Sequence, residues 1–288
     1  MRCVRVVTTT HGVGRLEGTV VSLIDTPFRH VGDALAVAGA LECLELAPIR
    51  GELALDDCEL LPPLGSPCAV WGVGLNYHSK ATATGRSVPT EPILYLSASS
   101  ACAPADGTVR IPVEQTLEMD YEGEIAVVVG RRMYQAGAGG VWACVAGVTA
   151  ANDMSARDVM RETGSPTLAK SFPGFNPIGM SLSTLDEFAN PDCIAVRTYV
   201  NDVLQQDDTS AGMIFGVPEL LARLSWYAAL EPGDVVLTGT PAGTGEDRRR
   251  FLVAGDVVRV EVESILPLIT TIATAVAAGS PMLADQAS

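Results

Sequence analysis

Lysine is nearly absent from this sequence: of its 19 basic residues only Lys80 and Lys170 are lysines. Acidic residues number 34 and give a net charge of −15, which would repel a nucleic-acid backbone rather than release its counterions. We therefore expect no nucleic-acid partner. Since arginine fills the other basic positions, the two positions that keep a lysine are candidates for a specific need for an ammonium group.

Long apolar runs are also missing. The longest nearly apolar stretch, residues 265–278, is interrupted by Pro267 and three threonines, whereas a membrane-spanning helix needs about 20 apolar residues. The first ten residues lack the apolar core of a signal peptide, so we expect a cytoplasmic protein with no membrane partner. Charged residues make up 18% of the chain and apolar residues 48%, which favours a large folded core over disorder.

Disulfide, zinc and nucleotide signatures are absent as well. The seven cysteines are odd in number, scattered and never spaced as C-x-x-C, a pattern typical of reduced, buried thiols. Residues 72–74 lack the third glycine and the following helix of a dinucleotide fingerprint. The loop at residues 239–245 lacks the G-K-[ST] ending of a Walker loop. We predict no NAD or Walker-type nucleotide site.

The pattern of apolar residues predicts two parts. Residues 1–60 contain β-branched runs at 3–10 and 18–24 and a predicted helix at 33–46, typical of a small N-terminal α+β domain. A proline-rich segment, residues 60–67, is predicted to be a linker to a domain spanning 61–288. That domain is predicted to be mainly β, with strands at 69–73, 93–96, 121–129, 195–200, 235–238 and 257–262. One helix is expected at 218–229, with one face formed by Leu220, Leu221, Leu224 and Tyr227.

Three carboxylates alternate along one predicted strand. Because side chains alternate with a period of two, Asp120, Glu122 and Glu124 should share a face. After Glu124 both faces are apolar, which indicates a strand buried on both sides. An isolated buried carboxylate is costly, so we expect a cation beside Glu124. The alternative is an edge strand whose acidic side chains face water.

A further carboxylate, Asp153, follows the apolar run 145–151 and should stand at a strand end. It is a candidate third metal ligand, with an Asx turn or a helix N-cap as the alternative. An all-oxygen set without histidine or cysteine suits Mg²⁺ or Mn²⁺ better than Zn²⁺. Lys170 lies in an otherwise apolar, glycine- and proline-rich loop, and the 239–245 loop could offer backbone N–H groups and the Thr240 hydroxyl to an anion.

Several short motifs occur in a characteristic order and spacing. They are residues 74–77, 120–124, 152–158, 170–172, 200–201 with Gln205, 232–234 and 239–243. Over residues 60–265 this series resembles the fumarylacetoacetate hydrolase family. The resemblance implies an α+β protein with a mixed β-sandwich or β-roll core and few helices, usually a homodimer. It also implies Mg²⁺ or Mn²⁺ held by Glu122, Glu124 and Asp153, and hydrolysis, decarboxylation or tautomerisation of 2-oxo or β-diketo acids.

The resemblance assigns further roles and exposes departures. Lys170 matches a catalytic position, and the positions expected to bind substrate are Arg157, Thr240, Tyr77 and His78. Hydrolytic members carry N-Y-x-x-H-x-x-E, whose histidine and glutamate activate water, but here those positions hold Lys80 and Ala83. Ser97 replaces a family lysine, and Met160 replaces a frequent glutamine.

The sequence therefore predicts a metal-dependent hydrolase, lyase or isomerase of a 2-oxo or β-diketo acid. Decarboxylation and enol–keto isomerisation need no activated water, so the missing dyad weakens the expectation of hydrolysis most. Lys80 or His78 could replace the missing base. Two alternatives stay open: dehydration or cyclisation with Lys80 as the base, and a catalytically silent, metal-stabilised dimeric binding protein.

Overall fold

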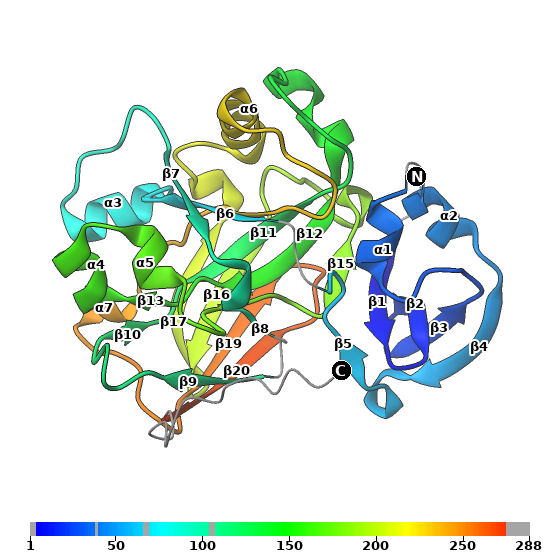
Figure 1. The fold of residues 1–288 in the computed structure, drawn as a ribbon, viewed down its shortest axis with the longest axis horizontal. Coiled ribbons are helices and arrows are strands. Elements are labelled where there is room, and N and C mark those ends of the chain that lie inside the picture. Colours follow the sequence, from blue (N-terminus) through cyan, green and yellow to red (C-terminus); the bar gives the residue numbers. More distant parts are fainter. Residues whose placement is uncertain (1–3, 38–39, 66–68, 104–106, 275–288) are drawn as a thin grey trace, which may run out of the picture.

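Two β-sheets form the centre of the protein, and short helices lie around them (Figure 1). The structure is a computed structural model that describes residues 4–37, 40–65, 69–103 and 107–274. One sheet has 11 strands, and its central part runs in the order β1-β15-β12-β11-β18-β6-β7. The other has five strands, in the order β17-β16-β19-β20-β9. The mixed β core with few helices that the sequence predicted is confirmed.

The strands of the N-terminal region extend the large sheet. They are β1 (Arg5–Thr9), β2 (Gly12–Glu17), β3 (Val20–Ile24), β4 (Ile49–Ala54) and β5 (Leu60–Leu61). Through β1 this region pairs antiparallel with β15 (Ser181–Ser183). Figure 1 shows the region, in blue, at one end of the molecule. The β-branched runs at 3–10 and 18–24 contain β1 and β3, whereas the division at residue 60 stays a prediction.

The expectation of a single helix at residues 33–46 is wrong. The helix predicted at 33–46 is two short helices, α1 (Val31–Leu35) and α2 (Ala40–Leu46), with Ala36 as the C-cap of α1. Valine and glycine, which follow at positions 37 and 39 of the sequence, are weak helix formers.

The described part of the segment predicted to be a linker, residues 60–67, packs against the N-terminal region instead. Leu60 and Leu61 form β5, which pairs with β1, and Leu64 is buried in the core. A Cβ at Gly32 would lie 2.6 Å from the Leu64 carbonyl oxygen, so helix α1 packs closely on this segment. Apolar residues on both sides of the prolines thus override the linker signal, and the last two linker residues, 66 and 67, lie outside the described residues.

The strand that carries the acidic motif lies in the middle of the large sheet. All seven residues of β11 (Gly123–Val129) are buried, so the expectation of a strand buried on both faces is confirmed and the edge-strand alternative is wrong. Its neighbours in the sheet are β12 (Val145–Asn152) and β18 (Val235–Leu237), followed by β6 (Val70–Gly74) and β7 (Ile93–Ser97). The strand starts two residues later than predicted.

The five-stranded sheet packs against β11 and β12 and closes the main core. Its strands are β9 (Thr108–Ile111), β16 (Ala195–Val200), β17 (Val203–Thr209), β19 (Val257–Val262) and β20 (Leu268–Thr274). The two sheets approach so closely that a Cβ at Gly123 would lie 1.9 Å from the Thr198 Oγ1 atom. Short strands complete the fold: β8 (Cys102–Ala103), β10 (Met119–Asp120), β13 (Ser155–Ala156) and β14 (Asn176–Pro177).

Four short helices gather at one side of the molecule, at the left of Figure 1. They are α3 (His78–Thr84), α4 (Arg157–Thr163), α5 (Pro166–Lys170) and α7 (Gly245–Arg248). The 3₁₀ helices are η1 (Leu55–Asp57), η2 (Ser99–Ala101), η3 (Ala138–Cys144), η4 (Leu185–Glu187) and η5 (Ser210–Gly212). Such short helices depend on tertiary packing for their stability.

The helix predicted at 218–229 is α6 (Val217–Tyr227), with a proline in its first turn. Its three leucines are buried as predicted, but the expectation for Tyr227 is wrong because that side chain is 76% exposed. Tyr227 is the last residue of the helix, beyond the part that packs on the core.

The cysteines are free, as predicted, in the described part of the chain. Two of them, Cys43 and Cys193, are nevertheless exposed, so the expectation of buried thiols is wrong there. Cys3 and Cys68 lie outside the described residues. Because none of these thiols lines the cavity described below, we assign them no role in the site.

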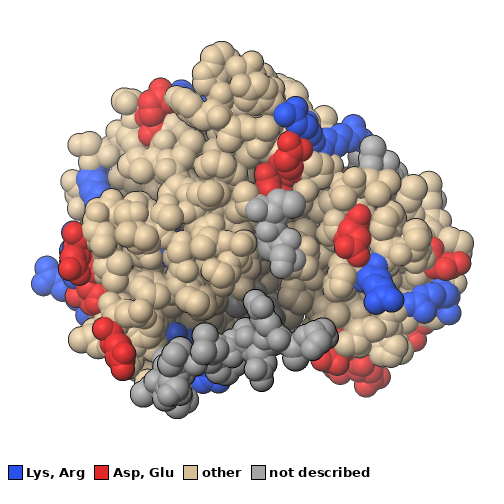
Figure 2. Space-filling model, viewed as in Figure 1, with Lys and Arg blue, Asp and Glu red and all other residues tan. Residues whose placement is uncertain are grey.

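Charges on the face shown in Figure 2 are few and scattered. In the described part of the chain, no helix combines the length and the apolar character that crossing a membrane requires.

Large apolar side chains stay exposed on this single chain, among them Leu117, Trp226 and Tyr227. Because association removes such surface from water, we expect the protein to form a homodimer. Light scattering at micromolar concentration should give twice the 30.1 kDa mass of the chain. The mass of a single chain would contradict this prediction.

Candidate metal centre and active site

Three buried carboxylates, those of Glu122, Glu124 and Asp153, converge in the structure. One oxygen from each lies within 4.8 Å of the others. The sheet register explains why the three residues lie close together. Gly123 pairs with Asn152, and the Asp153 N–H donates to the Glu122 carbonyl oxygen at 2.8 Å. The structure therefore brings together the three residues that the sequence put forward as metal ligands.

Asp120 does not belong to this cluster. It lies in the two-residue strand β10, and residues 121–122, which belong to no strand, separate β10 from β11. Its carboxylate accepts hydrogen bonds from Arg157 Nε at 2.8 Å and from the backbone N–H groups of Gly245 and Glu246 at 2.6 and 3.0 Å. The expectation that all three carboxylates share one strand face is wrong for Asp120, because the strand is interrupted.

Two cations lie beside the carboxylates, but they pair with Glu122 and Asp153 and not with Glu124, beside which a cation was expected. Lys170 Nζ donates to Glu122 Oε2 at 2.5 Å and also to Asp153 Oδ2. Arg157, the first residue of α4, contacts the other oxygen of Glu122. Lys170 was expected in a loop, but it is the last residue of α5, whose N-terminus is capped by Ser165.

The electrostatic environment shifts the pKa values of the two glutamates in opposite directions. Although burial opposes it, the charges of Arg157 and Lys170 hold the pKa of Glu122 below its ordinary value. Burial first, and then the nearby Asp153, raise the pKa of Glu124 well above its ordinary value. Burial lowers the pKa of Lys170, but Asp153 and Glu122 outweigh it and raise this pKa above the ordinary value. Lys170 is therefore an ammonium ion at neutral pH.

These features fit a hard divalent cation. The donor set consists of carboxylate oxygens alone, which Mg²⁺ and Mn²⁺ prefer. Among the described residues, no lysine or arginine forms an ion pair with Glu124, whose carboxylate accepts only the Gly239 N–H, at 2.7 Å. A divalent ion would supply the positive charge that this glutamate lacks.

Two residues that the sequence did not reveal hold Asp153 in place. The Tyr95 hydroxyl donates to Asp153 Oδ2, and Asn176 Nδ2 donates to Asp153 Oδ1 at 2.7 Å. Lys170 Nζ lies 5.2 Å from the centre of the Tyr95 ring. A tyrosine in a predicted strand and an asparagine before a proline carry no local signal of such a role.

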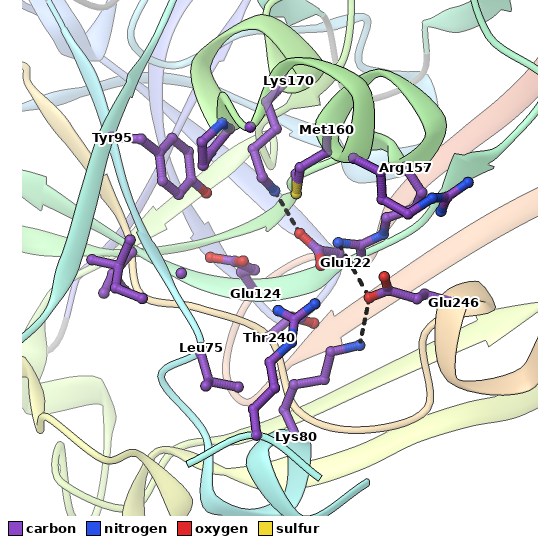
Figure 3. A pocket seen from close by; sticks show the side chains of 17 residues that line it. Leu75, Lys80, Tyr95, Glu122, Glu124, Arg157, Met160, Lys170, Thr240 and Glu246 are labelled. Atoms are coloured by element: carbon purple, nitrogen blue, oxygen red, sulfur yellow. Dashed lines mark hydrogen bonds and ion pairs between the residues drawn. The ribbon is translucent and has the colours of Figure 1, made fainter. Parts of the chain in front are cut away.

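A cavity of about 410 Å³ opens beside the carboxylates. Figure 3 shows the labelled side chains around it: Lys170 is directed toward Glu122, while Glu246 lies between Arg157 and Lys80. Thr240 and Met160 also line this cavity. Of the residues expected to touch substrate, the structure thus places Arg157, Thr240, Lys80 and Lys170 around one space.

Backbone N–H groups of the loop after β18 donate hydrogen bonds to anions, but these anions are carboxylates of the protein itself. The N–H groups of Gly239, Gly243 and Gly245 donate to the carboxylates of Glu124, Asp247 and Asp120. The Thr240 hydroxyl donates to the Gly123 carbonyl oxygen at 2.9 Å and accepts from Gln206 Nε2 at 2.7 Å. The loop therefore positions the acidic residues of the site.

Tyr77 and His78 do not line the cavity. His78 is exposed at the start of α3, and Tyr77 is fully buried, with no described hydrogen-bond partner for its hydroxyl. Of the two positions of the missing dyad, Ala83 is exposed and Lys80 is buried. Ser97, which replaces the family lysine, is buried outside the cavity lining. The substrate-binding roles of Tyr77 and His78 stay predictions.

The match to a family model covers residues 69–273, and that family is described as fumarylacetoacetate (FAA) hydrolase C-terminal. The oxaloacetate tautomerase fahd2 of Xenopus laevis mitochondria is 38% identical over 218 residues, which cover 74% of this chain and 68% of that protein. The fumarylacetoacetate hydrolase structure from Exiguobacterium antarcticum matches with a TM-score of 0.80 and 27% identity, covering 95% of this chain and 99% of that one. A 5-carboxymethyl-2-hydroxymuconate delta-isomerase structure from Mycobacterium smegmatis matches with a TM-score of 0.75 and 28% identity, covering 96% and 100%.

Proposed function

The chain belongs to the fumarylacetoacetate hydrolase family, and we propose that it is a divalent-metal-dependent enzyme that interconverts the enol and keto forms of a 2-oxo acid. The observation that carries this proposal is the buried triad of Glu122, Glu124 and Asp153 with Lys170 against it, open to a cavity of about 410 Å³. The names of the similar tautomerase and isomerase support the reaction class.

The residues of the site suit this chemistry. The ion, when bound, would polarise the 2-oxo group and stabilise negative charge on its oxygen. Lys170, held as an ammonium ion by two carboxylates, places a second positive charge beside that oxygen. Arg157 is held by Asp120 and Glu122, so its guanidinium is fixed at the cavity wall. These groups stabilise an enolate without an activated water molecule.

The departures from the hydrolytic pattern favour isomerisation over hydrolysis. Lys80 occupies the position of the water-activating histidine, and its Nζ atom donates to Thr244 Oγ1 at 2.6 Å and to Asp247 Oδ1 at 2.8 Å. With Ala83 exposed next to it on α3, no carboxylate stands at the second dyad position. We propose that Lys80 contributes positive charge and positions α7, rather than acting as a base for dehydration or cyclisation.

A substrate panel tests the proposal. Purified protein with Mg²⁺ or Mn²⁺ should convert the enol form of oxaloacetate or of an acylpyruvate to the keto form faster than it hydrolyses either compound or decarboxylates oxaloacetate. Faster hydrolysis of an acylpyruvate would contradict the assignment. Absence of turnover on the whole panel would favour the alternative of a metal-stabilised binding protein.

Replacement of Lys80 by methionine should affect both stability and activity. The change leaves the partly buried Asp247 without its cation, so we expect the free energy of unfolding to fall by about 1 to 3 kcal/mol. It also removes a charge from the cavity, so kcat should fall. Chemical denaturation and steady-state kinetics measure the two effects. A variant with unchanged stability and kcat would show that neither role exists.

A further inference from the structure

Glu246, the second residue of α7, is a carboxylate of the cavity lining that belongs neither to the triad nor to its hydrogen-bond partners. Its backbone N–H donates to Asp120 at 3.0 Å, and a capping box between Thr244 and Asp247 fixes the turn around it. Its side chain lines the cavity and is 26% exposed. The local structure therefore fixes where this carboxylate stands while leaving it open to a bound molecule.

The Glu246 carboxylate stands between two cations. Its Oε2 atom lies 3.8 Å from Lys80 Nζ and 3.7 Å from Arg157 Nη1 (Figure 3). Both distances are those of ion pairs and exceed hydrogen-bond length. Within the described ranges, no donor forms a hydrogen bond to this carboxylate, whereas the carboxylates of Asp120, Glu122, Glu124, Asp153 and Asp247 all accept at least one. Glu246 thus keeps its acceptor capacity for a ligand.

We propose that Glu246 is the residue that moves the proton between oxygen and carbon. The proposal rests on the proposed function, since enol–keto conversion requires that a proton leave the enol oxygen and that a proton reach C3. The Glu246 carboxylate takes the proton of the enol O–H group, which leaves an enolate and a neutral carboxyl group. That carboxyl group then delivers the proton to C3: the C2=C3 π pair forms the C3–H bond, and an oxygen lone pair forms the C2=O bond. The carboxylate is regenerated, and no other reactant is consumed.

The surrounding cations match this role. Ion pairs to Lys80 and Arg157 hold the Glu246 carboxylate at the cavity wall, where an entering substrate can reach it. The arrangement also accounts for a lysine at the position of the family histidine, since α3 then supplies a charge and α7 supplies the base. A carboxylate from α7 takes the place of the dyad that α3 has lost.

The test uses Glu246→Gln, which keeps the size of the side chain and removes its basicity. General acid–base catalysis contributes about 10²- to 10⁴-fold to a rate, so kcat for tautomerisation should fall at least about 100-fold. Deuterium incorporation at C3 in D₂O, followed by NMR, should fall equally. Oxalate affinity and the Mn²⁺-induced rise in Tm should stay unchanged, because Glu246 is not in the triad. Glu246→Asp should recover part of the rate.

Glu231→Gln is the matched control, because this exposed glutamate pairs with Arg132 away from the cavity. It should leave all four readouts unchanged. A Glu246→Gln variant that keeps its rate of C3 exchange overturns the proposal, as does one whose loss of rate follows from a loss of oxalate affinity. Wild-type protein without turnover would instead overturn the proposed function itself, and this inference with it.

Discussion

Replacement of Lys170 by methionine should lower kcat by about 10- to 150-fold in the metal-loaded protein, because a charge-assisted contact to the enolate is worth about 1.5 to 3 kcal/mol. Methionine keeps most of the aliphatic length and removes the ammonium group, which in the structure lies against Glu122 and Asp153. The loss should appear in kcat and in kcat/KM alike, because the contact strengthens as charge develops on the substrate oxygen.

Steady-state kinetics at saturating Mn²⁺ measure this effect, and a thermal melt of the same sample shows that the variant is folded. The matched control is Arg132→Met, which removes an exposed cation that pairs with Glu231. Its turnover should equal that of the wild type. A folded, metal-loaded Lys170→Met protein with wild-type kcat would remove the proposed electrostatic role of this lysine.

Chelation of divalent ions by EDTA should lower Tm and abolish turnover, and Mg²⁺ or Mn²⁺ should restore both. A ligand that binds only the native state stabilises it by about 2.7 kcal/mol at a hundredfold excess over Kd. For a chain of 288 residues that corresponds to a shift in Tm of about 4 to 5 °C. Calorimetry of the chelated and the reloaded protein measures the shift.

Glu124→Gln provides the control for that shift. Burial and the neighbouring Asp153 raise the pKa of Glu124, so the metal-free wild type tends toward the neutral side chain that glutamine imitates. The amide oxygen can still accept the Gly239 N–H, so the variant should fold. We expect it to lose most of the metal-induced rise in Tm. A rise equal to that of the wild type would show that Glu124 is not a ligand.

The triad could be predicted from the sequence because it depends on local rules. The alternation of a strand predicted that Glu122 and Glu124 lie together, although Glu122 stands just before the first residue of β11. The end of an apolar run predicted that Asp153 follows a strand, and it comes directly after β12. The same alternation failed for Asp120, because residues 121–122 separate its strand from β11 and its carboxylate is bound by Arg157 and the N-terminus of α7. The two-residue alternation therefore predicts the direction of side chains only within one continuous strand.

Residues brought in from distant segments could not be predicted. Tyr95, Asn176 and Glu246 reach the site through sheet order and helix packing, and none of them stands in a local pattern that indicates a ligand or a base. The short helices α5 and α7 were not expected, because stretches of four or five residues carry little periodicity. Tertiary contacts, rather than intrinsic propensity, form the wall of the cavity that faces the triad.

The most direct test of the account is a crystal structure of the protein with Mn²⁺ and oxalate, a mimic of the enolate of a 2-oxo acid. We predict an anomalous peak between Glu122, Glu124 and Asp153, with oxalate in the cavity beside Lys170 and within reach of Glu246. A crystal grown with both compounds that shows no peak at the triad, or oxalate bound away from Lys170, would contradict the account.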